Sequence, residues 1–252
     1  MNVNAYLERI HYHGTPRVTF HTLAALQLGH MREVPFENLA IHDQQPILLD
    51  EALLFTKIVR NRRGGFCYEL NGLFAKLLQE IGFTVTLISA EVCQKDGTFG
   101  PAFDHLALLV ELDDVFLVDV GFGDSFTRPL RLEQRGPQVH GTTAYLIRQE
   151  RDTYILHQKN LAEPGSDWEI QYRFTRQARQ LADFSRMCHY HQTSPESHFT
   201  QKRICSRATA EGRVTLSDQR LIVTQGAMRT ETILPSEAAF SQALQAHFSI
   251  QI

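Results

Sequence analysis

The sequence predicts an α+β protein in which a mainly helical part precedes antiparallel β-structure. Three observations support this. Apolar residues within residues 1–84 recur at spacings of three and four, the period of amphipathic helices. After Gly82 the apolar period falls to two, which is typical of strands. The apolar runs from residue 85 to 175 are short and separated by turn residues, which favours an antiparallel sheet or barrel.

Two helices are expected before the central one. Residues 20–31 carry an amphipathic pattern that Pro35 ends. Asp50 is a suitable N-cap for a second helix over residues 51–60, because its carboxylate can accept the unpaired N–H groups of a first turn. The residues expected to point inward in the second helix are Leu53, Leu54 and Ile58.

A third helix is expected to begin at Cys67 and to end at Gly82. Gly64 and Gly65 precede it, where a backbone without Cβ atoms can turn sharply. A thiol at a helix N-terminus ionises more easily, and the thiolate is the nucleophilic form. A free cysteine can equally continue a buried stripe, so the helix alone leaves both interpretations open. The stripe itself is Leu70, Phe74, Leu77, Leu78 and Ile81.

The remaining elements divide the chain into three expected parts, 1–84, 85–192 and 193–252. Helices are expected over residues 177–189 and after Ser236, a suitable N-cap. The segment 193–195 is the expected second boundary. The expected strands are 83–87, 106–111, 115–120, 154–157, 168–174, 202–208, 213–216, 221–224 and 228–233.

Composition narrows the function classes. The 252 residues are 43% hydrophobic and 21% charged, as in an ordinary globular protein. A net charge of -3 argues against a general nucleic-acid binder, and no apolar run is long enough to cross a membrane. The N-terminus lacks the layout of a signal peptide. Four cysteines without a Cys-x-x-Cys pair indicate reduced thiols, and we therefore expect a cytoplasmic protein.

Two isolated polar residues are candidate partners for Cys67. His105 opens an apolar strand, and Asp119 stands near the end of the next one. A buried carboxylate is costly unless it is paired. A catalytic cysteine needs a base for its proton and a third group to orient that base. Taken separately, His105 could be a core histidine bonded to backbone, and Asp119 a carboxylate bonded to turn N–H groups.

The length of the intervening loop decides whether the two can meet. A two-residue loop would place His105 and Asp119 on opposite faces of the hairpin. A three-residue loop over residues 112–114 pairs Glu111 with Val115 and brings both side chains to one face, within diagonal reach.

Other patterns are weaker. Residues 121–123 (GFG) follow a strand, but the third glycine and the helix of a nucleotide-binding turn are missing. No ligand set for a metal is complete, although histidines two residues apart occur at His11 with His13 and His189 with His191. We therefore expect no metal.

Five motifs together resemble the arylamine N-acetyltransferases. The likeness runs from about residue 5 to 250 in the order found in that family, and the combination is specific. The motifs are residues 34–39 (VPFENL), 63–71 (RGGFCYELN), 119–123 (DVGFG), 194–199 (SPESHF) and 205–212 (CSRATAEG).

The resemblance implies a catalytic triad of Cys67, His105 and Asp119 in a papain-like arrangement. It also implies a helical bundle that carries the cysteine, a β-barrel that carries the histidine and aspartate, and a C-terminal α/β lid. These correspond to the three expected parts, 1–84, 85–192 and 193–252.

The resemblance further implies acetyl transfer from acetyl-coenzyme A to small aromatic amines, hydrazines or N-hydroxyarylamines. Phe36 and Phe122 match residues that line the acceptor pocket of the family, and Thr209 matches a threonine near bound coenzyme A. Family members usually continue beyond the last helix expected here, so a chain ending at Ile252 suggests a shortened lid and coenzyme wall.

Three alternatives remain. Transglutaminases and papain-like peptidases share the triad order, and acetylation of the protein by acetyl-coenzyme A would exclude such a hydrolase. An amide synthase that closes a macrolactam from a carrier-bound chain shares these motifs, and binding of a carrier protein would support it. A ligand-binding protein with an inert Cys67 is the non-enzymatic alternative, which the intact triad disfavours.

Overall fold

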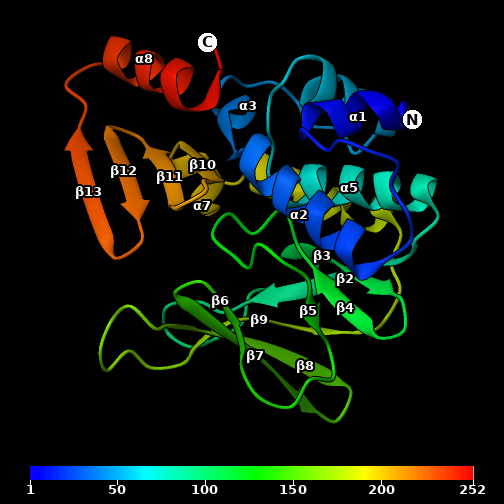
Figure 1. Ribbon diagram of the computed structural model, residues 1–252. Coiled ribbons are helices and arrows are strands. Elements are labelled where there is room, and N and C mark those ends of the chain that lie inside the picture. The colour runs from blue at the N-terminus through cyan, green and yellow to red at the C-terminus, as the bar shows by residue number, and fades with distance from the viewer. Residues whose placement is uncertain (252) are drawn as a thin grey trace.

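The protein combines a helical part with two antiparallel sheets (Figure 1). The computed structural model describes residues 1–251. An eight-stranded sheet curls into a nearly closed barrel beneath the N-terminal helices. A five-stranded sheet and a C-terminal helix form the third region. This architecture confirms the predicted α+β class.

The helix after Asp50 begins at the residue that its capping side chain predicts. The Asp50 carboxylate accepts the N–H groups of Ala52 and Leu53. Leu53 was expected to point inward, and this was wrong, because its side chain is 52% exposed. The second half of this helix widens into a π-turn that buries Ile58 and Val59. The bounds are α1 Val3–Arg9, α2 Phe20–Glu33, α3 Leu39–His42, α4 Glu51–Phe55, η1 Thr56–Arg60 and α5 Cys67–Ile81.

Helix α5 is the most buried helix of the N-terminal part. Ten consecutive residues from Cys67 to Lys76 include only one that is not buried. Gly82 ends the helix with a φ of 108°, a conformation that glycine adopts without strain. The predicted helix and its stop are therefore confirmed. Because its apolar stripe packs into the largest core cluster, the first turn of the helix is held in a fixed place.

The barrel sheet has the strand order β5-β4-β3-β2-β9-β8-β7-β6. Its two edge strands are bridged by the Gln138 side chain, which accepts the Arg131 N–H and donates to the Arg131 carbonyl. This bridge brings the edges together. The bounds are β2 Thr84–Val92, β3 His105–Glu111, β4 Val115–Val118, β5 Leu130–Arg131, β6 Gln138–His140, β7 Thr143–Glu150, β8 Thr153–Asn160 and β9 Glu169–Thr175.

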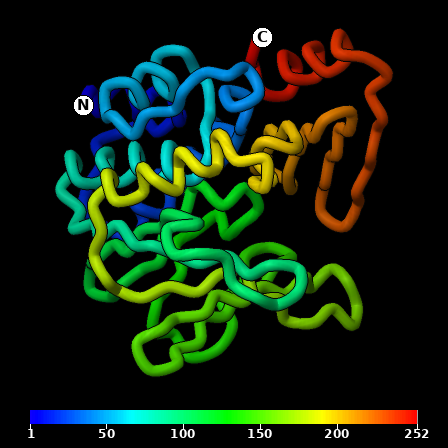
Figure 2. Tube along the Cα trace, turned by 180° about the vertical axis from the view of Figure 1, so that it is seen from behind, coloured from blue at the N-terminus to red at the C-terminus, as the bar shows by residue number. Residues whose placement is uncertain are grey.

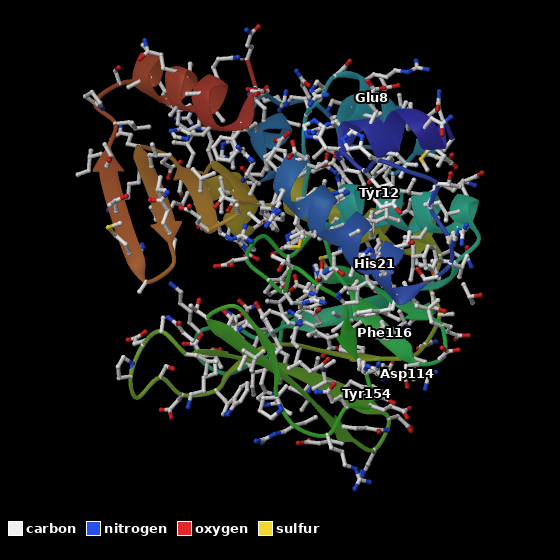
Figure 3. The ribbon with its side chains drawn as sticks, in the orientation of Figure 1. Glu8, Tyr12, His21, Asp114, Phe116 and Tyr154 are labelled. Atoms are coloured by element: carbon white, nitrogen blue, oxygen red, sulfur yellow. The ribbon has the colours of Figure 1, made fainter. Side chains whose placement is uncertain are left out.

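The β3–β4 hairpin has the register that the three-residue loop predicts. Glu111 pairs with Val115, and β4 ends at Val118, one residue before Asp119. Phe116 packs its ring 4.9 Å from that of Phe20, which attaches this hairpin to the start of α2. Figure 3 shows Phe116 below the α2 helix that carries His21.

The expected helix 177–189 begins later than predicted. Arg179 still pairs with the barrel, because its N–H donates to the Leu87 carbonyl. Asp183 then accepts the Gln180 N–H and starts the helical segment. This segment comprises η2 Leu181–Phe184 and α6 Ser185–Thr193 and leads to α7 His198–Gln201. Figure 2 shows it in yellow, crossing between the N-terminal helices and the barrel.

The second sheet joins both ends of the chain. Its order is β1-β10-β11-β12-β13, so the strand from the VPFENL segment pairs with a strand about 170 residues later. The Asn38 amide donates to the carbonyls of Phe199 and Lys202 and accepts the Ile204 N–H. The bounds are β1 Phe36–Glu37, β10 Ile204–Ala208, β11 Gly212–Ser217, β12 Arg220–Gln225, β13 Met228–Ile233 and α8 Glu237–Phe248.

Packing crosses the expected divisions of the chain. Phe184 and Cys188, from the middle part, belong to the same core cluster as the N-terminal helices. The boundaries near residues 84 and 192 stay a prediction. Among residues 1–251, no helix has the length and apolar character required to span a membrane.

Candidate active site

Cys67 is the first residue of α5 and is 3% exposed. The two residues before Phe66 and Cys67 are glycines, and both are closely packed. A Cβ on Gly64 would lie 1.9 Å from the Pro35 carbonyl oxygen, and one on Gly65 would lie 2.6 Å from the Glu69 carboxylate. No side chain fits at either position, so the Gly-Gly entry is required by close packing.

A buried ionic network holds the start of α5. Glu69 accepts the N–H of Phe66, the residue before the helix, and forms an ion pair with Lys57 at 2.7 Å. Burial raises the pKa of Glu69, and the Lys57 ammonium opposes this effect. Arg63 and Glu37 form a second pair at 3.2 Å. The paired charges keep the Cys67 end of the helix from fraying.

The environment of Cys67 opposes ionisation of an isolated thiol. Burial raises its pKa well above the usual value, and the backbone of Leu106 offsets only part of this effect. The position at a helix start is therefore insufficient to form the thiolate. A nearby group must take the proton and remain as the balancing cation.

The structure brings His105 and Asp119 together. His105 Nε2 lies 2.7 Å from Asp119 Oδ2. The Tyr172 hydroxyl donates to the same oxygen, and the Gly121 N–H donates to Oδ1. Since Asp119 is fully buried, these donors satisfy carboxylate oxygens that water does not reach. His105 Nδ1 is left for another partner.

Asn71 completes this arrangement, although sequence reasoning assigned it no role. Its amide nitrogen donates to Asp119 Oδ1 at 2.9 Å and to the Leu106 carbonyl at 2.7 Å. Its amide oxygen accepts the Val120 N–H at 2.9 Å. Asn71 stands four residues after Cys67, one helical turn away on the same face, and this spacing is the signal that could have identified it.

Gly121 lies directly against the cysteine. A Cβ at this position would lie 2.7 Å from Cys67 Cα and 2.7 Å from the Asn71 amide nitrogen. The contact joins the loop after β4 to the first turn of α5. The spacing between the helix and the barrel therefore depends on a glycine at position 121.

Cys67 and His105 line one cavity of about 740 Å³. Phe36 and Phe122 line it as well, and the Phe122 ring lies 5.1 Å from the His105 ring in an edge-to-face arrangement. The other apolar residues of the wall are Val92, Pro101, Phe199 and Ile204. A flat aromatic molecule fits such a lining.

A second cavity of about 810 Å³ adjoins the first, and the two share Asp124 and Arg213. Thr209 lies on this second cavity and not on the first. Its wall carries four arginines, Arg32, Arg128, Arg213 and Arg229, and three carboxylates, Asp124, Glu163 and Glu211. Guanidinium groups of this kind bind phosphate through charge-assisted hydrogen bonds. Among residues 1–251, no group of three or more His, Cys, Asp or Glu side chains could hold a metal ion.

Comparisons with known proteins show which family the chain resembles. The N-acetyltransferase family model matches residues 19–252. The chain is 34% identical to an arylamine N-acetyltransferase of Mycolicibacterium smegmatis, over 100% of this chain and 93% of that protein. It is 33% identical to the proansamycin X synthase of Amycolatopsis mediterranei, over 92% of this chain and 91% of that protein.

A solved structure shares the fold. The Mycobacterium marinum arylamine N-acetyltransferase in complex with CoA is 29% identical, with a TM-score of 0.90 over 99% of this chain and 93% of that one. The family model and the relatives extend over nearly the whole chain. The protein therefore belongs to the arylamine N-acetyltransferase family.

Proposed function

We propose that the protein transfers an acetyl group from acetyl-coenzyme A to an aromatic amine, a hydrazine or an N-hydroxyarylamine. Cys67 carries the acetyl group between the two substrates. The observation that carries this proposal is the orientation of His105, whose Nε2 is held by a saturated, buried Asp119 while the ring lines the same cavity as Cys67.

In the first half-reaction His105 Nδ1 takes the Cys67 proton. The thiolate attacks the carbonyl carbon of the thioester, and the bond between that carbon and the coenzyme A sulfur breaks. The departing sulfur takes the proton back from His105. Asp119 holds the ring with Nε2–H toward the carboxylate and stabilises the charged ring.

In the second half-reaction the acceptor nitrogen attacks the acetyl-cysteine. His105 takes a proton from that nitrogen, and the Cys67 sulfur leaves as the thiolate. Phe36 and Phe122 would hold the aromatic ring of the acceptor and exclude water that would hydrolyse the intermediate.

Coenzyme A would occupy both cavities. Its phosphates would bind the arginines of the cavity that contains Thr209, and its thiol arm would pass Arg213 into the cavity of Cys67. The complex of the M. marinum protein with CoA supports a coenzyme site in this fold. Four free cysteines in the structure support our expectation of a reducing, cytoplasmic location.

Mass measurement after incubation with acetyl-coenzyme A alone tests the proposal. We expect one acetyl group on Cys67, lost when an aromatic amine such as an anisidine is added. Initial rates at several fixed amine concentrations should then give parallel double-reciprocal lines, as in a ping-pong scheme. Intersecting lines without acetylated Cys67 would exclude the covalent mechanism. A hydrolase would leave Cys67 without an acetyl group.

A second candidate is an amide synthase acting on a carrier-bound chain. The similarity to the proansamycin X synthase favours it, because that similarity is almost as large as the one to the M. smegmatis acetyltransferase. This function predicts acylation of Cys67 by a carrier-bound thioester and none by acetyl-coenzyme A. The same mass measurement with both donors separates the two.

A further inference from the structure

A second buried histidine lines the cavity of Cys67. His191 lies on α6, and its side chain is 4% exposed. Its Nε2 lies 3.1 Å from Asp104 Oδ1, and its Nδ1 lies 3.0 Å from Ser197 Oγ. All three residues line the cavity, and the mechanism above uses none of them.

The hydrogen bonds fix the orientation of the His191 ring. The Phe199 N–H donates to Ser197 Oγ, and the Ser197 hydroxyl is the partner of His191 Nδ1. The other ring nitrogen, Nε2, faces Asp104 Oδ1. Ser197 and His191 therefore hold one oxygen of the Asp104 carboxylate in place.

The second carboxylate oxygen of Asp104 has no donor. Within residues 1–251 it accepts no hydrogen bond, and it lies against Gly100, another residue of the cavity wall, where a Cβ would be 2.4 Å away. The Asp104 side chain is 11% exposed, on the cavity wall. A carboxylate oxygen in this setting is a strong acceptor for a donor on a bound molecule.

The backbone at Asp104 is strained and firmly held. Phe103 has a φ of 67°, which is rare for a bulky residue. Its N–H donates to Ser89 Oγ at 2.7 Å, and the Tyr68 hydroxyl donates to the carbonyls of Phe103 and Asp104 at 2.8 and 3.0 Å. Such strain persists only where the surroundings impose it, and it concentrates at ligand clamps. Tyr68 thus ties Asp104 to the helix that carries Cys67.

The fixed charges of the cavity are mainly negative. Arg213 forms an ion pair with Asp124 at 3.0 Å, which leaves Asp104 and Glu196 without a cationic side chain. His198 is the third histidine of the cavity, after His105 and His191, and burial lowers its pKa, so it is neutral at pH 7.5. The cavity therefore offers an aromatic lining near Cys67 and a negative charge at Asp104.

We propose that Asp104, positioned by His191 and Ser197, determines acceptor specificity. It binds a second, protonated nitrogen of the acceptor, distinct from the nitrogen that receives the acetyl group. The preferred acceptors are then aromatic amines or hydrazines with a second, cationic nitrogen. This inference rests on the proposed acetyl transfer and adds the class of acceptor.

Three anilines test this inference. They differ in the charge of the substituent opposite the aniline nitrogen. They are 4-(2-aminoethyl)aniline, its neutral isostere 4-propylaniline, and the anionic 3-(4-aminophenyl)propanoate. For each compound, kcat/KM for acetylation of the aniline nitrogen is measured at pH 7.5. We expect the wild-type enzyme to prefer the cation to the isostere by about 10- to 100-fold, the value of one charge-assisted hydrogen bond. The anion should be the poorest acceptor.

Asp104→Asn should bring the ratio of cation to isostere close to one, since the amide oxygen can still accept from His191 but the side chain carries no charge. Glu196→Gln is the matched control, because Glu196 lies on the same cavity and is exposed. If Asp104 acts by contact, the control keeps the wild-type ratio. An equal loss of selectivity in both variants would overturn the inference in favour of a general field effect.

Acetylation of Cys67 by acetyl-coenzyme A is measured in the same preparations. Acetylated Cys67 with equal rates for the three anilines would overturn the inference and leave the proposed function intact. Absence of acetyl-Cys67 would overturn both. If Asp104→Asn does not fold, the three rates of the wild-type enzyme still decide, because a purely structural Asp104 predicts no preference for the cation.

Discussion

Two aspartate–histidine pairs lie beside one cavity, and they differ in the number of donors around each carboxylate. Asp119 accepts four hydrogen bonds, from His105, Asn71, Tyr172 and Gly121, and is fully buried. Asp104 lines the cavity and accepts one side-chain hydrogen bond, from His191, which leaves its other oxygen without a donor within residues 1–251.

The difference shows how one pair of residue types can serve two purposes. A saturated carboxylate cannot move or bind anything else, so its effect is confined to the ring of His105. A carboxylate oxygen without a donor keeps its affinity for one, and His191 only holds the Asp104 carboxylate in place. The number of donors around each carboxylate, rather than its distance to a histidine, separates a positioning role from a binding role.

The largest expected effect is that of Asp119→Asn. The amide would place an N–H toward His105 Nε2, so the ring would carry its proton on Nδ1 and could not take the proton of Cys67. We expect acetylation of Cys67 to slow by about 10⁴-fold. Mass measurement of acetyl-Cys67 over time gives the rate.

The thermal midpoint of the same variant separates this role from a structural one. If the Asp119 carboxylate only bonded the loop at Gly121, the substitution would lower the thermal midpoint and leave the acetylation rate near the wild-type value. That result would remove Asp119 from the mechanism. The pairs Asp119–His105 and Asp104–His191 would then differ only in burial.

Gly121→Ala should have the next largest effect, because it separates the helix from the barrel without removing a catalytic group. The new Cβ would meet Cys67 Cα at 2.7 Å, and backbone atoms must shift to relieve the contact. A displacement of about 1 Å costs about 10²-fold in rate. Steady-state kinetics with acetyl-coenzyme A and an aromatic amine measures the loss.

A control for Gly121→Ala is available in the same helix as Cys67. A Cβ on Gly72 would lie 2.9 Å from a methyl group of Leu181, a flexible side chain that can turn away. Gly72→Ala should therefore keep its activity. Equal losses in the two variants would mean that added volume, and not the spacing at Cys67, limits the rate.

Asn71→Leu should affect stability as well as rate. The isosteric side chain would leave the Leu106 carbonyl and the Val120 N–H buried without partners, and Asp119 would lose one donor. Two such losses cost about 2–4 kcal/mol. Urea unfolding followed by circular dichroism should show this decrease in the free energy of unfolding. An unchanged unfolding curve would show that water replaces the amide.

The elements that could be predicted from the sequence are those whose apolar residues are regularly spaced. Helix α5 was predicted because its apolar stripe ends at Gly82. Strand β7 was not predicted, because its apolar run is short and its second half, Arg148, Gln149 and Glu150, is polar and exposed. The pairing of β1 with β10 could not be predicted either, since a two-residue strand has no periodicity.

Part of the candidate site could likewise be predicted from the sequence, and part could not. His105 and Asp119 were recognisable as lone polar residues in apolar strands, and hairpin parity placed them on one face. The Asp104–His191 contact joins residues 87 positions apart, one before a strand and one on a helix. No local pattern records such a contact, and the spacing of His189 and His191 suggested only an incomplete metal site.

A third buried histidine, which has no carboxylate partner, gives the smallest expected effect. The Tyr6 hydroxyl donates to His30 Nδ1 at 2.9 Å, and burial lowers the pKa of His30 to about 3. Because the unfolded chain binds a proton near pH 6.5 and the folded protein does not, acid favours unfolding. The stability that neutral His30 contributes is present above pH 6.5 and is lost as the pH falls toward 3.

His30→Gln removes this titration while its amide oxygen can still accept from Tyr6. Between pH 7 and pH 5 the free energy of unfolding of the wild-type protein should fall by about 2 kcal/mol more than that of the variant. Urea unfolding at the two pH values measures the difference. Parallel pH dependences would mean that the buried ring gains a proton in the folded protein. A histidine could then be charged in this core without a carboxylate partner.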